Sequence, residues 1–333
     1  MTSPFAYWQG RRVVVTGAAG LVGSHLCDLL VEAGARVLAV DDLSKGILER
    51  LTHLEGRIQF AKADLCAPNA ARDLFRGQEI VLHLASRAYG IAYSADHHDE
   101  MYRFNVDLNR KVLDACAAAR VARVLAVSTS CVYPDDAPCP TPELPVNTGE
   151  PEKANRGYGQ AKRELEIDAA RLARETGIAV AIVRPVNAYS GRYKWEGNYS
   201  HVIPMLVKRI MDGDDPLVIW GSGRQRRNFL HAVDFGRCFL AVTEHYATAD
   251  PVNVGYEETV TMEELARAIG DAAGRRPAIR FDPSKPEGRL VKSADSTKLR
   301  RVTGGMTPSV PLAAGLREMI EWYHRSFSQK DTR

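Results

Sequence analysis

Short apolar runs alternate along this chain with longer stretches whose apolar residues recur every three or four positions. The runs lack the polar alternation of a strand with one wet face, so they predict strands that are covered on both faces. The longer stretches predict amphipathic helices that pack on those faces. Strands that alternate with helices indicate an α/β fold with a doubly wound parallel sheet. The predicted strands cover residues 13–16, 36–40, 58–60, 80–83, 124–127 and 179–183, and the clearest helices cover 21–33, 100–119 and 158–175.

The alternation loosens after residue 185, where loops that contain Gly and Arg separate short elements. We therefore predict a sheet domain over residues 1–185 and a smaller C-terminal substrate-binding domain over 186–228 and 271–333. Between these segments, at about residues 229–270, the chain is expected to return to the sheet domain. The chain is expected to return through residues 233–246 and 252–255.

A glycine motif follows the first predicted strand. Gly17, Gly20 and Gly23 stand at every third position, and Leu21 and Val22 open the first helix. Glycine lets backbone N–H groups approach a pyrophosphate, and a helix N-terminus favours its negative charge. A tight strand-to-helix turn without a ligand would use the same glycines, but the strand–helix–strand context favours a Rossmann-type dinucleotide site.

Asp41 closes the second predicted strand, 24 residues after Gly17. A carboxylate at this place accepts hydrogen bonds from the adenosine ribose hydroxyls and repels a 2′-phosphate. No Lys or Arg follows it before Lys45, so we predict NAD rather than NADP as the cofactor. Asp42 is the alternative carboxylate for the same role.

Tyr158 and Lys162 are four residues apart and therefore share one face of the predicted helix. A phenol and an ammonium next to a dinucleotide indicate proton transfer coupled to redox chemistry at an alcohol or ketone. An isolated Tyr and Lys at this spacing are more often surface residues, so the glycine motif upstream carries the prediction. A proline-rich stretch at 134–151 precedes the pair, excludes a helix or a central strand, and is expected to form one wall of the site.

Taken together, these features resemble the extended short-chain dehydrogenase/reductase family, in its nucleotide-sugar epimerase/dehydratase branch. The resemblance covers nearly the whole chain. It implies that Tyr158 is the acid/base at the C4 hydroxyl of a sugar, that Lys162 and the nicotinamide lower its pKa, and that Thr129 holds the same oxygen. Further cofactor contacts implied by the resemblance are those of Asp64 and Leu65 beside the adenine and of Leu84, Ala85 and Ser86 on the nicotinamide side.

Dehydratases of this branch carry Asp and Glu directly after the Thr129 position, where this chain has Ser130 and Cys131. This difference counts against a 4,6-dehydratase. Cys131 resembles the thiol of the GDP-mannose 3,5-epimerases and GDP-fucose synthases of the branch, which deprotonate carbon next to a transient 4-ketone. A thiol suits this task because its pKa, about 8.5 when unperturbed, can be tuned towards neutrality. A buried structural cysteine is the alternative, and His201 is the candidate for the second acid/base.

The resemblance also extends to the C-terminal half. It implies that Arg209 and Arg227 hold a diphosphate, that Lys285 and Trp220 lie near the nucleotide, and that Asn187 lies near the sugar. The favoured function is NAD-dependent 3,5-epimerisation of a GDP-hexose. The alternatives are a GDP-4-keto-6-deoxysugar epimerase-reductase, a plain 4-epimerase and a catalytically silent NAD-binding protein.

Composition narrows the partners. A net charge of +3 over 333 residues argues against nucleic acid or an anionic membrane, and no apolar run is long enough to span a bilayer. The six cysteines show no paired spacing, which predicts free thiols in a reducing cytoplasm. No metal-ligand spacing is present, so no metal is predicted. A homodimer is implied only by the resemblance.

Overall fold

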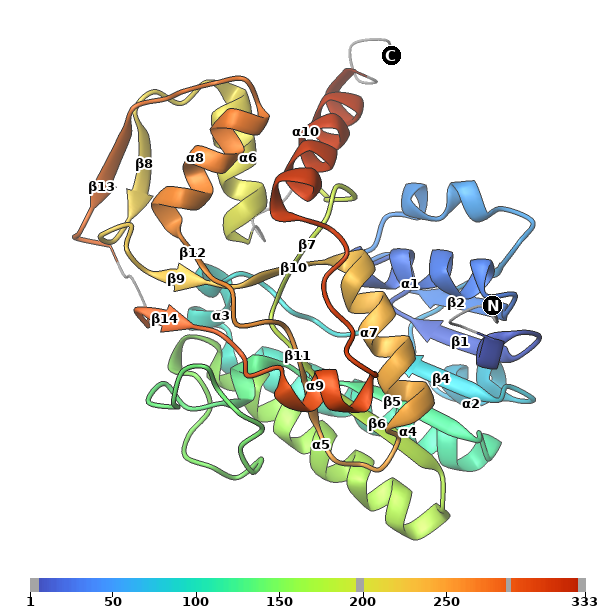
Figure 1. Ribbon diagram of the computed structural model, residues 1–333. Coiled ribbons are helices and arrows are strands. Elements are labelled where there is room, and N and C mark those ends of the chain that lie inside the picture. Colours follow the sequence, from blue (N-terminus) through green and yellow to red (C-terminus); the bar gives the residue numbers. More distant parts are fainter. Residues whose placement is uncertain (1–5, 196–200, 286–288, 329–333) are drawn as a thin grey trace.

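Seven parallel strands form the central sheet, in the order β11-β6-β5-β4-β1-β2-β3 (Figure 1). The structure, a computed structural model, describes residues 6–195, 201–285 and 289–328. All four residues of β4 are buried, as expected for a strand covered on both faces. The strands of this sheet are β1 (Arg12–Thr16), β2 (Arg36–Asp41), β3 (Gln59–Lys62), β4 (Ile80–His83), β5 (Arg123–Val127), β6 (Ala179–Pro185) and β11 (Val252–Val254).

Helices cover both faces of the sheet (Figure 1). On one face, α1 (Leu21–Glu32) packs against α7 (Ala232–His245), with Leu26, Leu30 and Phe239 in the core between them and the sheet. On the other face, α4 (His98–Ala119) packs against α5 (Arg156–Thr176), and α2 (Ala70–Phe75) lies beside α4. The predicted doubly wound parallel sheet is confirmed, and the predicted ends of these elements differ from the observed ends by no more than two residues.

A third apolar cluster lies outside the sheet domain. It joins α6 (Val202–Asp212), α8 (Met262–Ala272) and α10 (Leu312–Ser328) with the parallel pair β8 (Leu217–Trp220) and β13 (Ile279–Asp282). Smaller pairings link the two regions. They involve β7 (Asn187–Tyr189), β9 (Arg226–Arg227), β10 (Phe229–His231), β12 (Val260–Thr261) and β14 (Val291–Lys292).

The packing differs from the predicted domain boundaries at two helices. The prediction assigned residues up to about 270 to the sheet domain, but the apolar face of α8 packs on α6 and α10. Conversely, α9 (Thr297–Val302) lies in the predicted substrate domain, yet Leu299 belongs to the core under α7 and β11. Periodicity shows that a helix has an apolar face but not which surface that face meets, so the sequence could not assign these helices.

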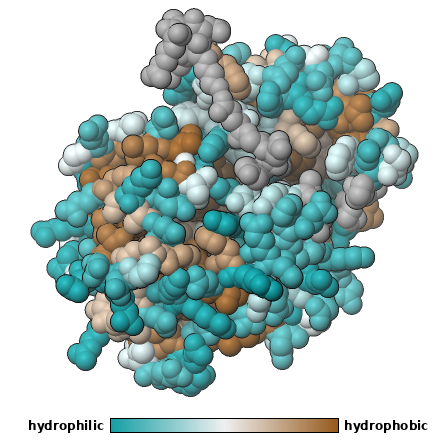
Figure 2. Space-filling view, turned by 180° about the vertical axis from the view of Figure 1, so that it is seen from behind, coloured by the Kyte–Doolittle hydropathy of each residue, from teal (hydrophilic) through white to brown (hydrophobic). Residues whose placement is uncertain are grey.

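The proline-rich stretch at 134–151 forms neither a helix nor a continuous strand, as predicted. It is fastened to the C-terminal part by a bridge between Thr141 and Ala294, and by Arg289, which donates to the Ala137 carbonyl at 2.6 Å. On the face turned away in Figure 1, hydrophobic and hydrophilic residues are intermixed (Figure 2). In the described parts of the chain, no helix has both the length and the hydropathy needed to cross a membrane.

Candidate active site

The predicted site residues follow the carboxyl ends of neighbouring strands, the edge at which open α/β sheets bind ligands. The glycine motif follows β1, Asp41 ends β2, Ser86 follows β4 and Thr129 follows β5. Because these strands are parallel and adjacent, segments far apart in sequence meet at this edge.

The glycine turn packs so closely against its own backbone that it admits no side chains. Gly17 has a φ of +69°, and a Cβ there would lie 2.9 Å from backbone atoms of Ala85. A Cβ on Gly23 would lie 2.2 Å from the Gly17 carbonyl oxygen. Gly20 is the N-cap of α1 and has no side chain that could accept hydrogen bonds from the first turn. No side chain therefore caps the helix at Leu21 and Val22. This is the geometry of a pyrophosphate cradle.

Asp41 is 7% exposed and lies against the glycine turn. One carboxylate oxygen accepts from the Ala19 N–H at 3.0 Å and the other from the Leu43 N–H at 2.9 Å. Burial raises the pKa of Asp41, and these backbone bonds oppose that effect. A carboxylate oxygen can accept two hydrogen bonds, so Asp41 keeps capacity for the ribose hydroxyls. Asp42 accepts hydrogen bonds from the backbone N–H and the hydroxyl of Ser44 in its own loop. It is therefore the weaker candidate for contact with the ribose.

Arg50 is a part of this region that sequence reasoning missed. Its guanidinium is buried, donates to the Ala19 carbonyl at 2.8 Å and to the Arg192 carbonyl at 2.6 Å, and opposes the pKa rise of Asp41. Arg50 therefore helps to hold the glycine turn in place through the Ala19 carbonyl. Nothing in the sequence near Arg50 signals this contact, because it depends on how the following loop folds back.

The remaining predicted cofactor residues divide into exposed and buried ones. Asp64 is exposed and accepts from the Cys66 N–H at 2.8 Å, whereas Leu65 is 5% exposed and packs in the core. The N–H groups of Leu84 and Ala85 donate to the Thr16 hydroxyl, at 3.2 and 3.1 Å. These bonds hold the segment after β4 beside the glycine turn.

Tyr158 and Lys162 lie side by side on α5, as predicted. The Lys162 ammonium is 5.7 Å from the centroid of the Tyr158 ring and donates to the Val127 carbonyl at 2.8 Å. The Ser86 side chain lies close enough to the Tyr158 hydroxyl to lower its pKa. Burial raises the pKa of Tyr158, and burial lowers the pKa of Lys162 to about 7, opposed by the charge of Glu166. Neither side chain is a solvated surface residue.

Cys131 lies in the short 3-10 helix Ser130–Val132, whose N-cap is Thr129. The Thr129 hydroxyl accepts from the Cys131 N–H at 3.2 Å, and Cys131 is within electrostatic range of Tyr158. The thiol was expected to have a pKa near neutrality. Instead, burial, opposed by Lys292 and reinforced by Glu152, raises the pKa of Cys131 to about 12.

Glu152 and Lys292 were not predicted as site residues. The Lys292 ammonium lies 3.0 Å from both carboxylate oxygens of Glu152, and both side chains are largely buried, at 15% and 14% exposure. Glu152 precedes Tyr158 by six residues in a loop, and Lys292 lies on β14 near the C-terminus. A charge in a proline-rich loop gives no sequence signal of burial, so only the fold could reveal the pair.

His201 is the N-cap of α6 and directly follows residues outside the described ranges, among them Ser200 of the segment that suggested it. His201 is exposed to solvent, although neighbouring protein atoms displace water from its ring. This desolvation, followed by the charge of Lys45, lowers the pKa of His201 to about 4, so the ring is neutral near pH 7. Lys45 itself donates to the Ala88 carbonyl, and burial lowers its pKa to about 8.

Two predicted substrate residues are tied to the protein itself. Arg209 on α6 donates to Asp214 at 2.7 Å and to the Val218 carbonyl at 2.6 Å, so these donors hold the connection from α6 to β8. Asn187 on β7 donates to the Asn228 carbonyl at 3.1 Å. Contact of Arg209 with a diphosphate and of Asn187 with a sugar stays a prediction.

The other three substrate candidates lie on the smaller region. Trp220 ends β8 with 52% of its surface exposed, and the Lys285 ammonium stands 5.9 Å from its ring centroid. An exposed indole beside a cation can accept a planar, negatively charged nucleotide. Arg227 on β9 donates to the Arg289 carbonyl at 2.8 Å.

Known proteins share this arrangement. The profile of the NAD dependent epimerase/dehydratase family matches residues 13–255, from β1 to the end of β11. The chain belongs to this family.

A GDP-L-fucose synthase of Dictyostelium discoideum is 27% identical over 320 residues, which cover 94% of this chain and 95% of the relative. A UDP-glucose 4-epimerase of Thermotoga maritima, solved with UDP-glucose, has a TM-score of 0.83 at 26% identity and covers 94% of this chain and 99% of its own. A dTDP-glucose 4,6-dehydratase of Streptomyces venezuelae, solved with NAD, has a TM-score of 0.81 at 26% identity over 96% and 98% of the two chains. The expected family is thus confirmed.

As a member of this epimerase/dehydratase family, the protein is an enzyme that acts on nucleotide sugars, and its cofactor is NAD. The residues present fit that cofactor: no side chain caps the N-terminal end of α1 at the glycine turn, and Asp41 stands at the end of β2. Asp64 and Ser86 follow β3 and β4 at the same edge of the sheet. NAD, when bound, would supply a hydride acceptor and donor.

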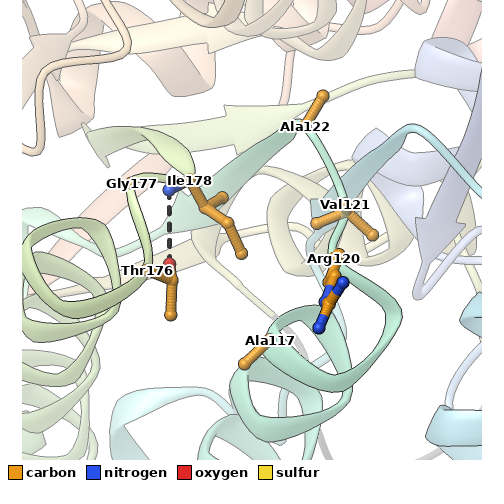
Figure 3. Close-up of a pocket in the computed structure, with 7 residues that line it drawn as sticks. All are labelled: Ala117, Arg120, Val121, Ala122, Thr176, Gly177 and Ile178. Carbon is orange, nitrogen blue, oxygen red and sulfur yellow. Dashed lines mark hydrogen bonds between the residues drawn. The ribbon is translucent and has the colours of Figure 1, made fainter.

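A cavity of about 350 Å³ lies at the other end of the sheet and takes no part in this site (Figure 3). It is an open hollow lined by the C-terminal ends of α4 and α5 and by the chain that enters β5 and β6. Among its lining residues, Arg120 is the one charged side chain, and none is an acid, a histidine or a cysteine. Its lining residues are Ala117, Arg120, Val121, Ala122, Thr176, Gly177 and Ile178.

Proposed function

We propose that this enzyme epimerises a GDP-hexose at C3 and C5 through a transient 4-ketone, with NAD bound throughout. The observation that carries the proposal is a thiol, Cys131, next to the Tyr158 and Lys162 pair in place of a dehydratase acid. A plain 4-epimerase needs Tyr158 but has no use for a second acid/base at this place.

Tyr158 removes the proton of the C4 hydroxyl during oxidation and returns it during reduction. Lys162 lies against its ring and stabilises the phenolate form when charged. Thr129 and Ser86 supply further hydroxyls, and Ser86 lies close enough to Tyr158 to lower the pKa of its phenol. A silent binding protein would need none of these contacts.

A ketone at C4 acidifies the C–H bonds at C3 and C5, because the carbanion electrons delocalise onto the carbonyl oxygen. Cys131 is partly exposed, while its backbone is fixed by Thr129. We assign it proton exchange at these carbons from one face. We assign His201, neutral near pH 7, to the opposite face.

A GDP-4-keto-6-deoxysugar epimerase-reductase is the second candidate, and the GDP-L-fucose synthase relative favours it. Such a reductase consumes an external reductant, usually NADPH. The buried Asp41 carboxylate disfavours it, because a 2′-phosphate would meet a fixed negative charge. The guanine base and a homodimer belong to the proposal and rest on resemblance, while a cytoplasmic location belongs to it and rests on the unpaired spacing of the cysteines.

The test uses the purified protein without added cofactor. The bound dinucleotide is released by denaturation and identified, and intact protein is incubated with GDP-mannose in deuterated water. The proposal expects bound NAD and deuterium at C3 and C5 with no net NADH. An empty site, with turnover only of a GDP-4-keto-6-deoxyhexose plus NADPH, would establish the reductase instead.

Single substitutions test whether Cys131 carries out the proton exchange. Cys131→Ala is expected to lose deuterium uptake while it keeps bound NAD. Cys139→Ala is the matched control, since this thiol is exposed and lies eight residues away. Wild-type uptake in Cys131→Ala would remove the thiol from the mechanism.

A further inference from the structure

Three chemically active side chains from distant parts of the chain form one cluster at the edge of the site. Cys131 follows β5, Glu152 belongs to the loop before α5, and Lys292 lies on β14. The Glu152 N–H donates to the Cys131 carbonyl at 3.2 Å, so the two backbones are fastened together. The Glu152 carboxylate also lies close enough to the Cys131 thiol to affect its protonation.

The ion pair beside the thiol is held by several hydrogen bonds. Lys292 approaches both oxygens of Glu152 at 3.0 Å, and the Asn155 amide donates to one of them at 3.0 Å. Burial would raise the pKa of Glu152, but Lys292 and these hydrogen bonds hold that pKa at about 2. Glu152 is therefore ionised whenever the thiol is at work.

We propose that Glu152 and Lys292 are positioning residues that set the protonation of Cys131 with opposite sign. The Glu152 carboxylate lies beside the thiol and, as a negative charge, favours its protonated form. Lys292 lies within electrostatic range and favours the thiolate. The catalytic use of this cluster rests on the proposed function, but the effect of Glu152 and Lys292 on the Cys131 thiol can be tested without a sugar substrate.

Reversible epimerisation explains why Cys131 needs both a negative charge and a positive charge beside it. In one direction Cys131 accepts a proton from carbon: the C–H bond breaks, an S–H bond forms, and the electron pair moves into the ketone as an enolate. In the other direction the S–H bond breaks, a C–H bond forms, and a thiolate remains beside the Lys292 ammonium. Cys131 must therefore exist as a thiol and as a thiolate during the reaction. Glu152 favours the thiol and Lys292 favours the thiolate.

Other charges around the cluster do not reproduce this effect. Thr129 bonds the thiol, and Tyr158 is a neutral phenol within electrostatic range. Arg227 on β9 lies within range of Lys292 and adds positive charge on the same side. Among the charged groups that act on the thiol, Lys292 and Glu152 have the largest effects.

The experiment measures alkylation of Cys131 by iodoacetamide from pH 6 to 10, in the protein as purified with its dinucleotide. All variants carry Cys139→Ala, because Cys131 and Cys139 share the tryptic peptide 124–153. Modification is quantified by mass spectrometry of that peptide. The thiolate is the reactive form, so the rate below the thiol's pKa reports its ionised fraction.

Glu152→Gln keeps the shape and removes the negative charge. We expect Cys131 to react at least about tenfold faster at pH 7.5, which corresponds to a pKa lower by about one. Lys292→Met removes the positive charge and is expected to slow the reaction by at least about tenfold. The double variant returns towards the parent rate, and Glu150→Gln, exposed in the same loop, leaves it unchanged.

Rates that change by less than about twofold, or in the same direction in both single variants, would overturn the proposal. The double variant guards against a fold defect, because it leaves no unpaired buried charge. Deuterium uptake is measured in parallel on the same proteins. Opposite shifts in alkylation without any uptake from GDP-mannose would retain this inference and reject the proposed substrate.

Discussion

The buried ion pair between Glu166 and Arg184 gives the sharpest stability prediction. Glu166 lies one turn after Lys162 on α5, and Arg184 lies on β6. Their side chains are 4% and 1% exposed, and two hydrogen bonds of 2.9 and 2.6 Å join them. Glu166 also accepts a hydrogen bond from Ser128, so the pair ties the helix to the end of the sheet.

Glu166→Gln removes the charge and keeps the shape. Arg184 keeps the Tyr133 hydroxyl and the Leu144 carbonyl as acceptors but loses its counter-ion. A buried charge left without its partner destabilises a protein by about 3–5 kcal/mol, whereas an exposed pair contributes about 0–1 kcal/mol. The matched control is Asp73→Asn, whose partner Arg76 is 83% exposed.

The assay is urea unfolding followed by tryptophan fluorescence, since urea does not screen charges. Trp8 lies in the sheet core and Trp195 in the cluster around α6, so both regions are observed. With a slope of about 3 kcal/mol per molar for a chain of this size, the midpoint should fall by about 1–1.7 M. A shift no larger than that of Asp73→Asn would refute the reasoning. Glu166→Leu combined with Arg184→Met should recover most of the loss, because neither buried charge then remains.

Two further predictions concern α5. Tyr158→Phe should lower turnover by about 10²–10⁴-fold and leave bound NAD in place, because it removes only the proton-transfer hydroxyl; turnover above a tenth of wild type would contradict this role. The pKa of Lys162 is about 7 in the folded protein, compared with its ordinary value of 10.5 in the unfolded chain. Between these two pH values the unfolded chain therefore binds more protons than the folded protein. The free energy of unfolding consequently increases as the pH rises through this range. Lys162→Met should therefore be stabilised relative to wild type by several kcal/mol at pH 7, and this advantage should shrink towards pH 10 in urea titrations. An advantage that does not change with pH would show that Lys162 is charged in the folded protein.

Much of the sheet domain follows from local pattern. Buried parallel strands need apolar residues on both faces, so residues 80–83 and 124–127 could be recognised without knowledge of their neighbours. The glycine spacing and the pair of Tyr158 and Lys162 are also local, because a tight turn and one face of a helix each span only a few residues. These features were sufficient to predict the family and the cofactor.

The tertiary structure decided what depends on contacts between distant segments. The apolar face of α8 could have packed on the sheet, and only the fold shows that it packs on α6 and α10. Glu152 and Lys292 are 140 residues apart, and each alone resembles a solvated surface charge. Burial is a property of the assembled protein, so the raised pKa of Cys131 and the ion pair that acts on it could not be read from the local sequence.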